Sequence, residues 1–247
     1  MDLFTTFFYQ PIYNALVLLV GAIPGGDVGL AVVILTVLVR FVLAPLSIQA
    51  LKSQKELQVI QPLMKELQEK YKNDKETQAK KMMELYKEHK VNPFASIGLI
   101  LLQIPVIIAL YMVFQRESLP NVDPELLYSF VAVPSAISLM FLGIFNIHVK
   151  SVALAVVAGL LQFIQGHLSL KSQPQTVSDN SFMQEFQKSM RVQIRFVIPL
   201  IIGFVAYSIS SAIAIYLITS TIFSIAQELV LRNTKGPEAA IPAINKA

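Results

Sequence analysis

The stretch Val28 to Leu51, VGLAVVILTVLVRFVLAPLSIQAL, decides the fold, because it is apolar for most of its length yet carries Arg40 near its middle. About 20 apolar residues are enough to cross a bilayer as a helix, so this stretch predicts a membrane span. An arginine at that depth costs about 2.5–3.5 kcal/mol on insertion scales and normally faces protein or water rather than lipid. Arg40 is therefore the first candidate functional residue.

The composition of the whole chain is that of a polytopic membrane protein. Hydrophobic residues make up 54% of the 247 positions, charged residues 15%, and the mean hydropathy is +0.59. A soluble domain normally has about 25% charged residues. The chain has no cysteine and three scattered histidines, which excludes a disulfide framework, an iron–sulfur cluster and a thiolate zinc site. The net charge of +4 comes from loop Lys and Arg, so it implies no direct nucleic-acid specificity.

Residues 1–27 precede this span and are continuously apolar only from about Ala15. We expect them to form an amphipathic helix in the outer membrane interface, which ends at the Pro24-Gly25-Gly26-Asp27 sequence. A short tilted span is the alternative. These residues contain no Lys or Arg, so they lack the positively charged region of a cleavable signal peptide.

Residues 52–92 differ sharply from the span before them, since positions 52–91 contain ten lysines and seven acidic residues. Apolar residues recur there at spacings of three and four on both sides of a turn at Asn73-Asp74. The two series are Leu57, Ile60, Met64, Leu67 and Tyr71, then Ala79, Met82, Tyr86 and His89. This pattern predicts a cytoplasmic antiparallel helical hairpin, whose exposed lysines orient the chain or contact anionic lipid or the ribosome.

Residues 93–231 are predicted to contain the remaining four spans. They lie at about 94–115, 151–169, 192–209 and 213–231, and residues 126–147 form a further apolar segment. If 126–147 stays at the outer face, 17 Lys and Arg lie inside and two outside; if it crosses, the numbers are 11 and eight. The positive-inside rule therefore favours five transmembrane helices, with the N-terminus outside and a short cytoplasmic tail at 232–247.

Polar residues form a stripe on each of two predicted spans, because their spacing places them on one helical face. The stripe of the first span is Thr36, Arg40 and Ser47, and that of the last span is Tyr216, Ser220, Ser224 and Gln227. Gln103, Gln162 and Gln165 add amides on two further spans. One stripe alone would indicate helix packing. Two stripes with additional amides favour a shared hydrated cavity.

Arg40 has no acidic residue at comparable depth in any of the five predicted spans. One interpretation is a structural arginine that is satisfied by carbonyls and amides. The favoured interpretation is a cation in a cavity that attracts acidic or polar groups of a passenger, since a low local dielectric strengthens that attraction.

Several functional classes lack their characteristic residues in this sequence. A proton-coupled transporter generally needs an intramembrane carboxylate or histidine, and a voltage sensor needs several arginines in series. The chain contains no GxSxG, HExxH, P-loop or paired-carboxylate motif. We therefore predict a protein that is not an enzyme, with no catalytic residues, no cofactor and no metal.

A set of motifs in order along the chain resembles the YidC family of membrane protein insertases. They are Phe8-Tyr9-Gln10-Pro11, Thr36-x-x-x-Arg40, Pro45-Leu46, Gln61-Pro62, Met82-Met83-x-Leu85-Tyr86-Lys87, Val91-Asn92-Pro93, Gln103-x-Pro105, Ala109-Leu110-Tyr111, Thr176-Val177-Ser178-Asp179, and Tyr216 with Gln227. The resemblance covers nearly the whole chain. It is to a compact bacterial type, without the large extracytoplasmic domain of Gram-negative members.

The resemblance implies five helices around a hydrophilic groove in the bacterial plasma (inner) membrane. Arg40 would be the groove cation, Thr36 its neighbour, and Gln103 and Tyr216 wall residues. The other expected groove residues are Ser47, Gln162, Ser220, Ser224 and Gln227.

The function implied is that of an insertase and folding chaperone, which moves short polar tails of nascent membrane proteins through the groove and releases apolar segments into lipid. Its partners would be nascent membrane proteins and membrane lipids, with the Sec translocon and the ribosome as further candidates. The alternatives are a small-solute channel or transporter that uses the same cavity, and a structural assembly factor.

Overall fold

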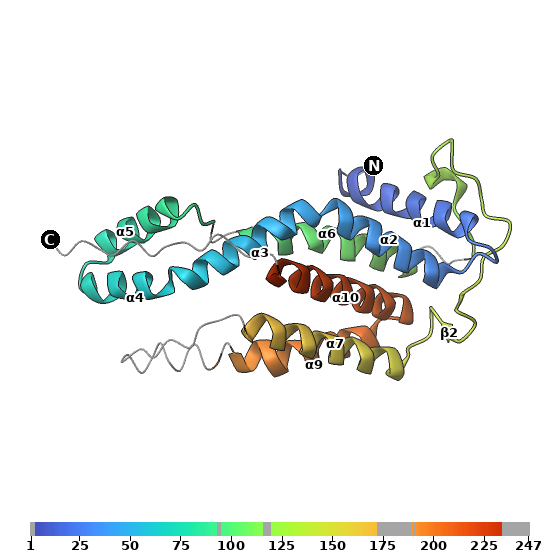
Figure 1. Ribbon diagram of the computed structural model, residues 1–247. Helices are drawn as coiled ribbons and strands as arrows, with labels where there is room; N and C mark the ends of the chain where they lie inside the picture. Colours follow the sequence, from blue (N-terminus) through green and yellow to red (C-terminus); the bar gives the residue numbers. More distant parts are fainter. Residues whose placement is uncertain (1–2, 93–94, 116–119, 172–188, 190, 234–247) are drawn as a thin grey trace.

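The computed structural model is mostly helical in the part of the chain that it describes (Figure 1). The described residues are 3–92, 95–115, 120–171, 189 and 191–233. Their only strands are β1 (Met140–Phe141) and β2 (Phe145–Asn146), which pair as a short antiparallel hairpin. The prediction of an all-α membrane protein is thus confirmed at the level of fold class.

The N-terminal helix packs against the rest of the protein. A π-helix, η1 (Thr5–Tyr9), continues into α1 (Gln10–Ala22), and both contact α6 (Ala95–Gln115), while α1 also contacts α2 (Val28–Val42). Its buried apolar residues recur at spacings of one, three and four and are Tyr9, Ile12, Tyr13, Leu16, Val17 and Val20. The expected helix is therefore present, and its position in the outer interface stays a prediction.

The turn that follows α1 fixes the start of α2. Gly26 has a φ of 64°, and a Cβ added there would lie 1.9 Å from the carbonyl oxygen of Ala136, so a side chain does not fit. Asp27 is the N-cap of α2, since its Oδ1 accepts from the backbone N–H of Leu30 at 2.9 Å. Its Oδ2 accepts from the N–H of Leu142 at 2.8 Å. One side chain thus joins the start of α2 to a distant segment.

The predicted first span is a bent helix. α2 and α3 (Ala44–Val59) meet at Leu43 at an angle of 61°. Pro45 accounts for the bend, because it has no N–H to donate and its ring clashes with the preceding turn. The helix does not end at Leu51 but continues to Val59, toward the lysine-rich region.

Two short helices, α4 (Gln61–Lys70) and α5 (Lys75–Glu88), lie side by side at the end of α3 and project from one end of the molecule (Figure 1). Their apolar cluster consists of buried Ile60, Leu85 and Val91 with Leu57, Leu63, Met64, Leu67 and Tyr86 packed around them. The first predicted apolar series largely matches this cluster. In the second series, Ala79 is exposed, and Leu85 and Val91 occupy the buried positions instead.

The apolar segment 126–147 contains no helix of membrane-spanning length and lies across the end of the molecule opposite the hairpin (Figure 1). A 3-10 turn, η2 (Pro124–Leu126), precedes it. Asn14 of α1 donates to the carbonyl of Leu126 at 2.8 Å and accepts from the N–H of Tyr128 at 2.7 Å. The segment is therefore attached to α1 by hydrogen bonds, and its place at the outer membrane face stays a prediction.

The C-terminal half consists of α7 (Val152–Lys171), a π-helix η3 (Gln193–Val197), α9 (Ile198–Ser208) and α10 (Ser211–Asn233). α10 is central, with α2 on one side and α7 on the other, and α7 packs along α9 (Figure 1). Gly159 and Gly203 allow this close packing, as in many membrane helix pairs.

Two described helices are individually long and apolar enough to cross a membrane, Val152–Leu170 and Ser211–Leu231. The bent α2–α3 pair counts as a third if it is one span. Two further apolar stretches, Gln103–Phe114 and Gln193–Ser208, are shorter. The described helices therefore support two to three spans by length and composition, which is fewer than the five expected.

Candidate functional site

Polar side chains of α10 contact four other helices. Ser220 contacts Arg40 of α2, Gln227 contacts Ser47 of α3, Tyr216 contacts Gln103 of α6, and Thr221 contacts Gln162 of α7. We call Tyr216, Ser220, Thr221, Ser224 and Gln227 the polar face of α10. The structure thus brings most of the predicted groove residues together around one helix.

Arg40 uses a neutral oxygen as its partner. Its Nη2 donates to the hydroxyl of Ser220, which is only 5% exposed, and the Tyr216 hydroxyl is near enough to interact electrostatically with the guanidinium. In the described part of the chain, the two ion pairs both lie in the α4–α5 hairpin, so Arg40 has no acidic partner there. A guanidinium has five N–H donors, and Ser220 accepts one of them.

The amide of Gln103 donates to the hydroxyl of Tyr216, which joins α6 to α10. Tyr216 is 2% exposed, and Gln103 is half-buried two residues before Pro105. A buried phenol needs a hydrogen-bond partner, and the amide supplies it. The contact places the two predicted wall residues next to each other.

A second set of contacts joins α3 to α10 beyond the bend. Two atoms of the Gln227 amide lie within hydrogen-bond distance of Ser47 Oγ: Nε2 at 2.8 Å and Oε1 at 3.0 Å. Further along, Lys55 Nζ donates to the carbonyl of Leu231 at 2.7 Å. Lys55 was not predicted as a site residue. It follows Ser47 by eight residues and so lies on the same helical face, which is the signal that could have identified it.

Two predicted residues direct their hydroxyls into their own helix. Thr36 is 2% exposed, and its hydroxyl donates to the carbonyl of Val32 at 2.6 Å. The hydroxyl of Ser224 donates to the carbonyl of Ser220 at 3.0 Å. Their spacing predicted the shared face correctly but could not predict that these short side chains would bond their own backbone.

Glu228 is a second residue that the prediction omitted. It is 7% exposed, and its Oε2 accepts from the hydroxyl of Ser169 of α7 at 3.0 Å. It directly follows Gln227 at the end of the polar face, and a buried carboxylate is costly unless it is hydrogen-bonded. The signal that could have identified Glu228 was its position next to Gln227 in the polar stripe. Its place near the end of the predicted span instead suggested an exposed side chain.

The chemistry of this arrangement is that of positive charge and hydrogen bonding. Among the residues that the structure describes, no group of three or more His, Cys, Asp or Glu side chains could hold a metal ion. The polar face offers hydroxyls, amides and one guanidinium. Such groups can bind a polar or acidic segment reversibly.

In the part of the chain that the structure describes, these features define a helical membrane protein in which Arg40 contacts an interior polar face. The chain belongs to the 60Kd inner membrane protein family, which it matches over residues 20–238. It is similar to proteins named membrane protein insertase YidC, with 32% identity to that of Wolinella succinogenes over 94% of this chain. It is 30% identical to the protein of Fusobacterium nucleatum over 82% of this chain, and 31% identical to that of Francisella tularensis subsp. novicida over 83% of this chain. The resemblance deduced from the motifs is confirmed.

The relatives differ in length. The matched region covers 38% of the Wolinella protein and 32% of the Francisella protein, but 85% of the Fusobacterium protein. This chain therefore corresponds to one part of the longer relatives and to most of the shorter one.

Proposed function

We propose that this chain is a membrane protein insertase, which helps short polar tails of nascent membrane proteins to cross the bilayer and releases their apolar segments into lipid. The observation that carries this proposal is the contact between Arg40 and Ser220, a cation paired with a neutral hydroxyl in the middle of apolar helices. Membership of a family whose relatives are named insertases supports it.

The proposal includes five spans around a hydrophilic groove: the α2–α3 pair, α6, α7, η3 with α9, and α10. α6 has 21 residues and is about 31 Å long at 1.5 Å per residue, which suits a hydrocarbon core of about 30 Å. The polar face of α10 and its partners would line the groove. The lysine-rich hairpin would lie in the cytoplasm and the segment 126–147 at the outer face, in accord with the positive-inside rule.

The mechanism follows from solvation. A hydrated groove shortens the apolar distance that a polar tail must cross, and Arg40 transiently attracts its acidic groups. The passenger's apolar segment then leaves sideways, driven by burial in lipid at about 25 cal/mol per Å². A membrane potential adds about 2.3 kcal/mol per charge per 100 mV. The partners would be nascent membrane proteins and lipids, with the Sec translocon and the ribosome as further candidates.

The test is insertion by the purified protein in lipid vesicles. The substrate is a single-span protein with a short acidic N-terminal tail, and insertion is scored by protection of that tail from protease. We expect protection that depends on the protein. Solute flux through the same vesicles without protection of the tail would overturn the proposal in favour of a channel.

Cross-linking tests where the substrate passes. A photo-reactive residue at half-buried Ser224, on the polar face, is compared with one at Leu200 of α9, which is 74% exposed and is not part of the polar face. We expect capture of a nascent chain from Ser224 and much less from Leu200. Equal capture from both positions would contradict passage along the polar face.

A further inference from the structure

An apolar groove runs between α7 and α9 and is separate from the polar face of α10. Its volume is about 590 Å³. Its lining includes Val156, Leu160 and Phe163 of α7 with Leu200, Phe204 and Tyr207 of α9. Gly159 and Gly203, which also line it, bring the two helices close together.

The exposure of the lining residues places this groove on the outer surface of the helix pair. Leu200 is 74% exposed and Phe204 70%, although both are strongly apolar. Apolar side chains exposed on a membrane-embedded pair of helices face lipid tails. The occupant of the groove should therefore be apolar along most of its length.

The length of the groove fits one acyl chain. From Val152 to Phe163 the lining follows α7 for eleven residue steps, or about 16 Å at 1.5 Å per residue. Half of a hydrocarbon core of about 30 Å is about 15 Å, which is the depth that one acyl chain fills.

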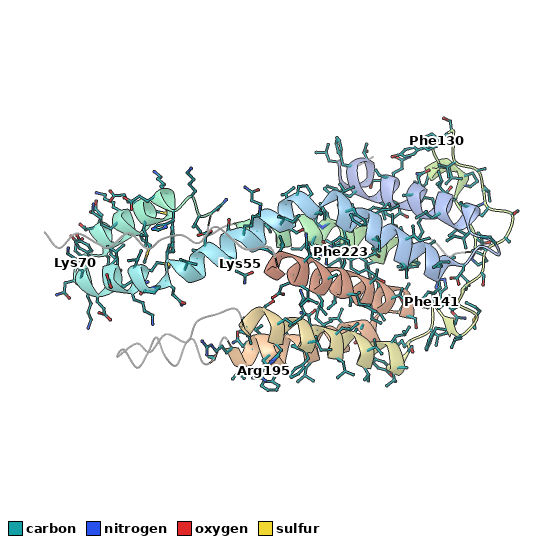
Figure 2. The ribbon with its side chains drawn as sticks, in the orientation of Figure 1. Lys55, Lys70, Phe130, Phe141, Arg195 and Phe223 are labelled. Carbon is teal, nitrogen blue, oxygen red and sulfur yellow. The ribbon has the colours of Figure 1, made fainter. Side chains whose placement is uncertain are left out.

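One end of the groove carries arginine. The Cζ atom of Arg195 lies 5.7 Å from the ring centroid of Phe196 and 6.0 Å from that of Phe163, and both rings line the groove. Arg195 belongs to η3, a rare π-helical turn of the kind often found at functional sites. Figure 2 shows Arg195 at the end of the α7–α9 pair that lies on the same side as the hairpin. Arg191 precedes it by four residues.

At the other end of the groove, the cation that the described residues supply is Lys150, whose Nζ lies 5.8 Å from the ring centroid of Tyr207. Arginine binds phosphate through two parallel hydrogen bonds, whereas lysine acts as a point charge. Two arginines one helical turn apart favour a headgroup with net negative charge, because a choline or ethanolamine group would bring its own cation close to them. The arginine end is therefore the headgroup end.

We propose that the α7–α9 groove is a binding site for an anionic phospholipid, with one acyl chain along the groove and the phosphate on Arg195. The site does not depend on the insertase function, because it shares no residue with the polar face of α10. It would give the α7–α9 pair a preferred lipid in place of an exchangeable bulk lipid.

The absence of tryptophan from this chain makes the site directly testable. A Phe204→Trp variant places one fluorophore in the groove, and a Leu101→Trp variant places one at an apolar position of α6 that is 61% exposed. Each protein is reconstituted in phosphatidylcholine vesicles that contain a minor fraction of either phosphatidylglycerol or phosphatidylcholine with brominated acyl chains. Bromine quenches tryptophan on contact, so quenching measures which lipid occupies each position.

We expect brominated phosphatidylglycerol to quench Phe204→Trp at about one tenth of the fraction that brominated phosphatidylcholine requires, a factor equivalent to about 1.4 kcal/mol. Leu101→Trp should show no such preference. Arg195→Gln should abolish the preference and Arg195→Lys should retain part of it, while Lys150→Gln, which removes a cation from the other end, should leave it unchanged.

Equal quenching of Phe204→Trp by the two lipids would overturn the proposal. So would equal losses in Arg195→Gln and Lys150→Gln, which would indicate general charge attraction and no headgroup site. Helix content measured by circular dichroism separates either result from a failure of the variant to fold.

Discussion

The side chains of Ser47 and Gln227 join α3 to α10, with Gln227 Nε2 at 2.8 Å and Oε1 at 3.0 Å from Ser47 Oγ. Ser47 lies just beyond the 61° bend between α2 and α3. Gln227 Nε2 also lies 3.5 Å from the carbonyl of Ala44, at the first residue of α3. One amide thus holds the start of α3 against α10, so the direction of α3 after the bend depends on α10.

A double-mutant cycle on Ser47→Ala and Gln227→Leu should detect this contact. We expect each single change to lower the unfolding free energy and a coupling of about 0.6 kcal/mol, the average for hydrogen bonds between membrane helices. The measurement is chemical unfolding of the purified protein in detergent. Additive effects of the two substitutions, with no coupling, would show that the pair does not interact in solution.

Arg40 offers a test of the electrostatic part of the proposed mechanism. A pair of unit charges 4 Å apart gains about 1 kcal/mol in water and about 4 kcal/mol near a protein surface. We therefore expect Arg40→Ala to slow insertion of an acid-tailed substrate at least about fivefold and Arg40→Lys to slow it little. The measurement is the rate of tail protection in vesicles.

The matched control for Arg40 is a substrate whose acidic tail residues are replaced by their amides. Arg40→Ala should slow its insertion much less than that of the acidic substrate. Equal slowing of both substrates would mean that Arg40 holds helices together through contacts such as that with Ser220 and does not attract charge.

Hydrophobicity and charge were sufficient to predict the main helices and the hairpin. The apolar runs match α7 and α10 closely, and the turn at Asn73-Asp74 lies between α4 and α5. The prediction assigned Leu57 to the first helix of the hairpin, whereas Leu57 lies in α3, which continues from the bend through Leu51 to Val59. Hydropathy identifies what lipid can solvate, whereas a helix continues wherever its backbone bonds are satisfied.

The sequence predicted which polar residues share a helical face, but it did not predict which residues of different helices contact each other. Helical spacing placed Ser220 and Gln227 on one stripe and Arg40 and Ser47 on another, and the structure brings these stripes together. The partners Gln103 and Tyr216 could not be paired from spacing, since their contact depends on how α6 packs beside α10. Hydrogen bonds between helices depend on tertiary packing, which the spacing of residues along the sequence does not determine.

Two glycines in helices provide a matched test of close packing. A Cβ at Gly166 of α7 would lie 2.8 Å from the carbonyl oxygen of Ile194 in η3, whereas a Cβ at Gly98 of α6 would meet no described atom within 4 Å. We expect Gly166→Ala to lower the melting temperature in detergent because backbone must shift. Gly98→Ala should leave it unchanged or raise it, since alanine favours a helix by up to about 1 kcal/mol. Equal shifts would contradict the close α7–η3 approach.

The hairpin should lose stability in acid through Asp74, the N-cap of α5. Thr77 donates from its hydroxyl to Oδ2 at 2.6 Å and from its N–H to Oδ1 at 3.0 Å, and these bonds lower the pKa of the Asp74 carboxyl below its usual value. The charged cap therefore contributes stability above the unfolded pKa of about 3.9, and this contribution is lost as the pH falls through the lower folded pKa.

Amide hydrogen exchange of α5 in the full chain, corrected for the intrinsic effect of pH, measures this loss. The Asp74→Asn variant keeps an acceptor for the cap but does not titrate, so it separates Asp74 from other carboxylates of the hairpin such as Glu76 and Glu84, which pair with Lys80 and Lys81. We expect protection of α5 to fall more in the unmodified protein than in Asp74→Asn as the pH is lowered below about 3.9. An equal fall in the two proteins would contradict the role of Asp74, because the Asp74→Asn cap keeps its acceptor and carries no carboxyl group.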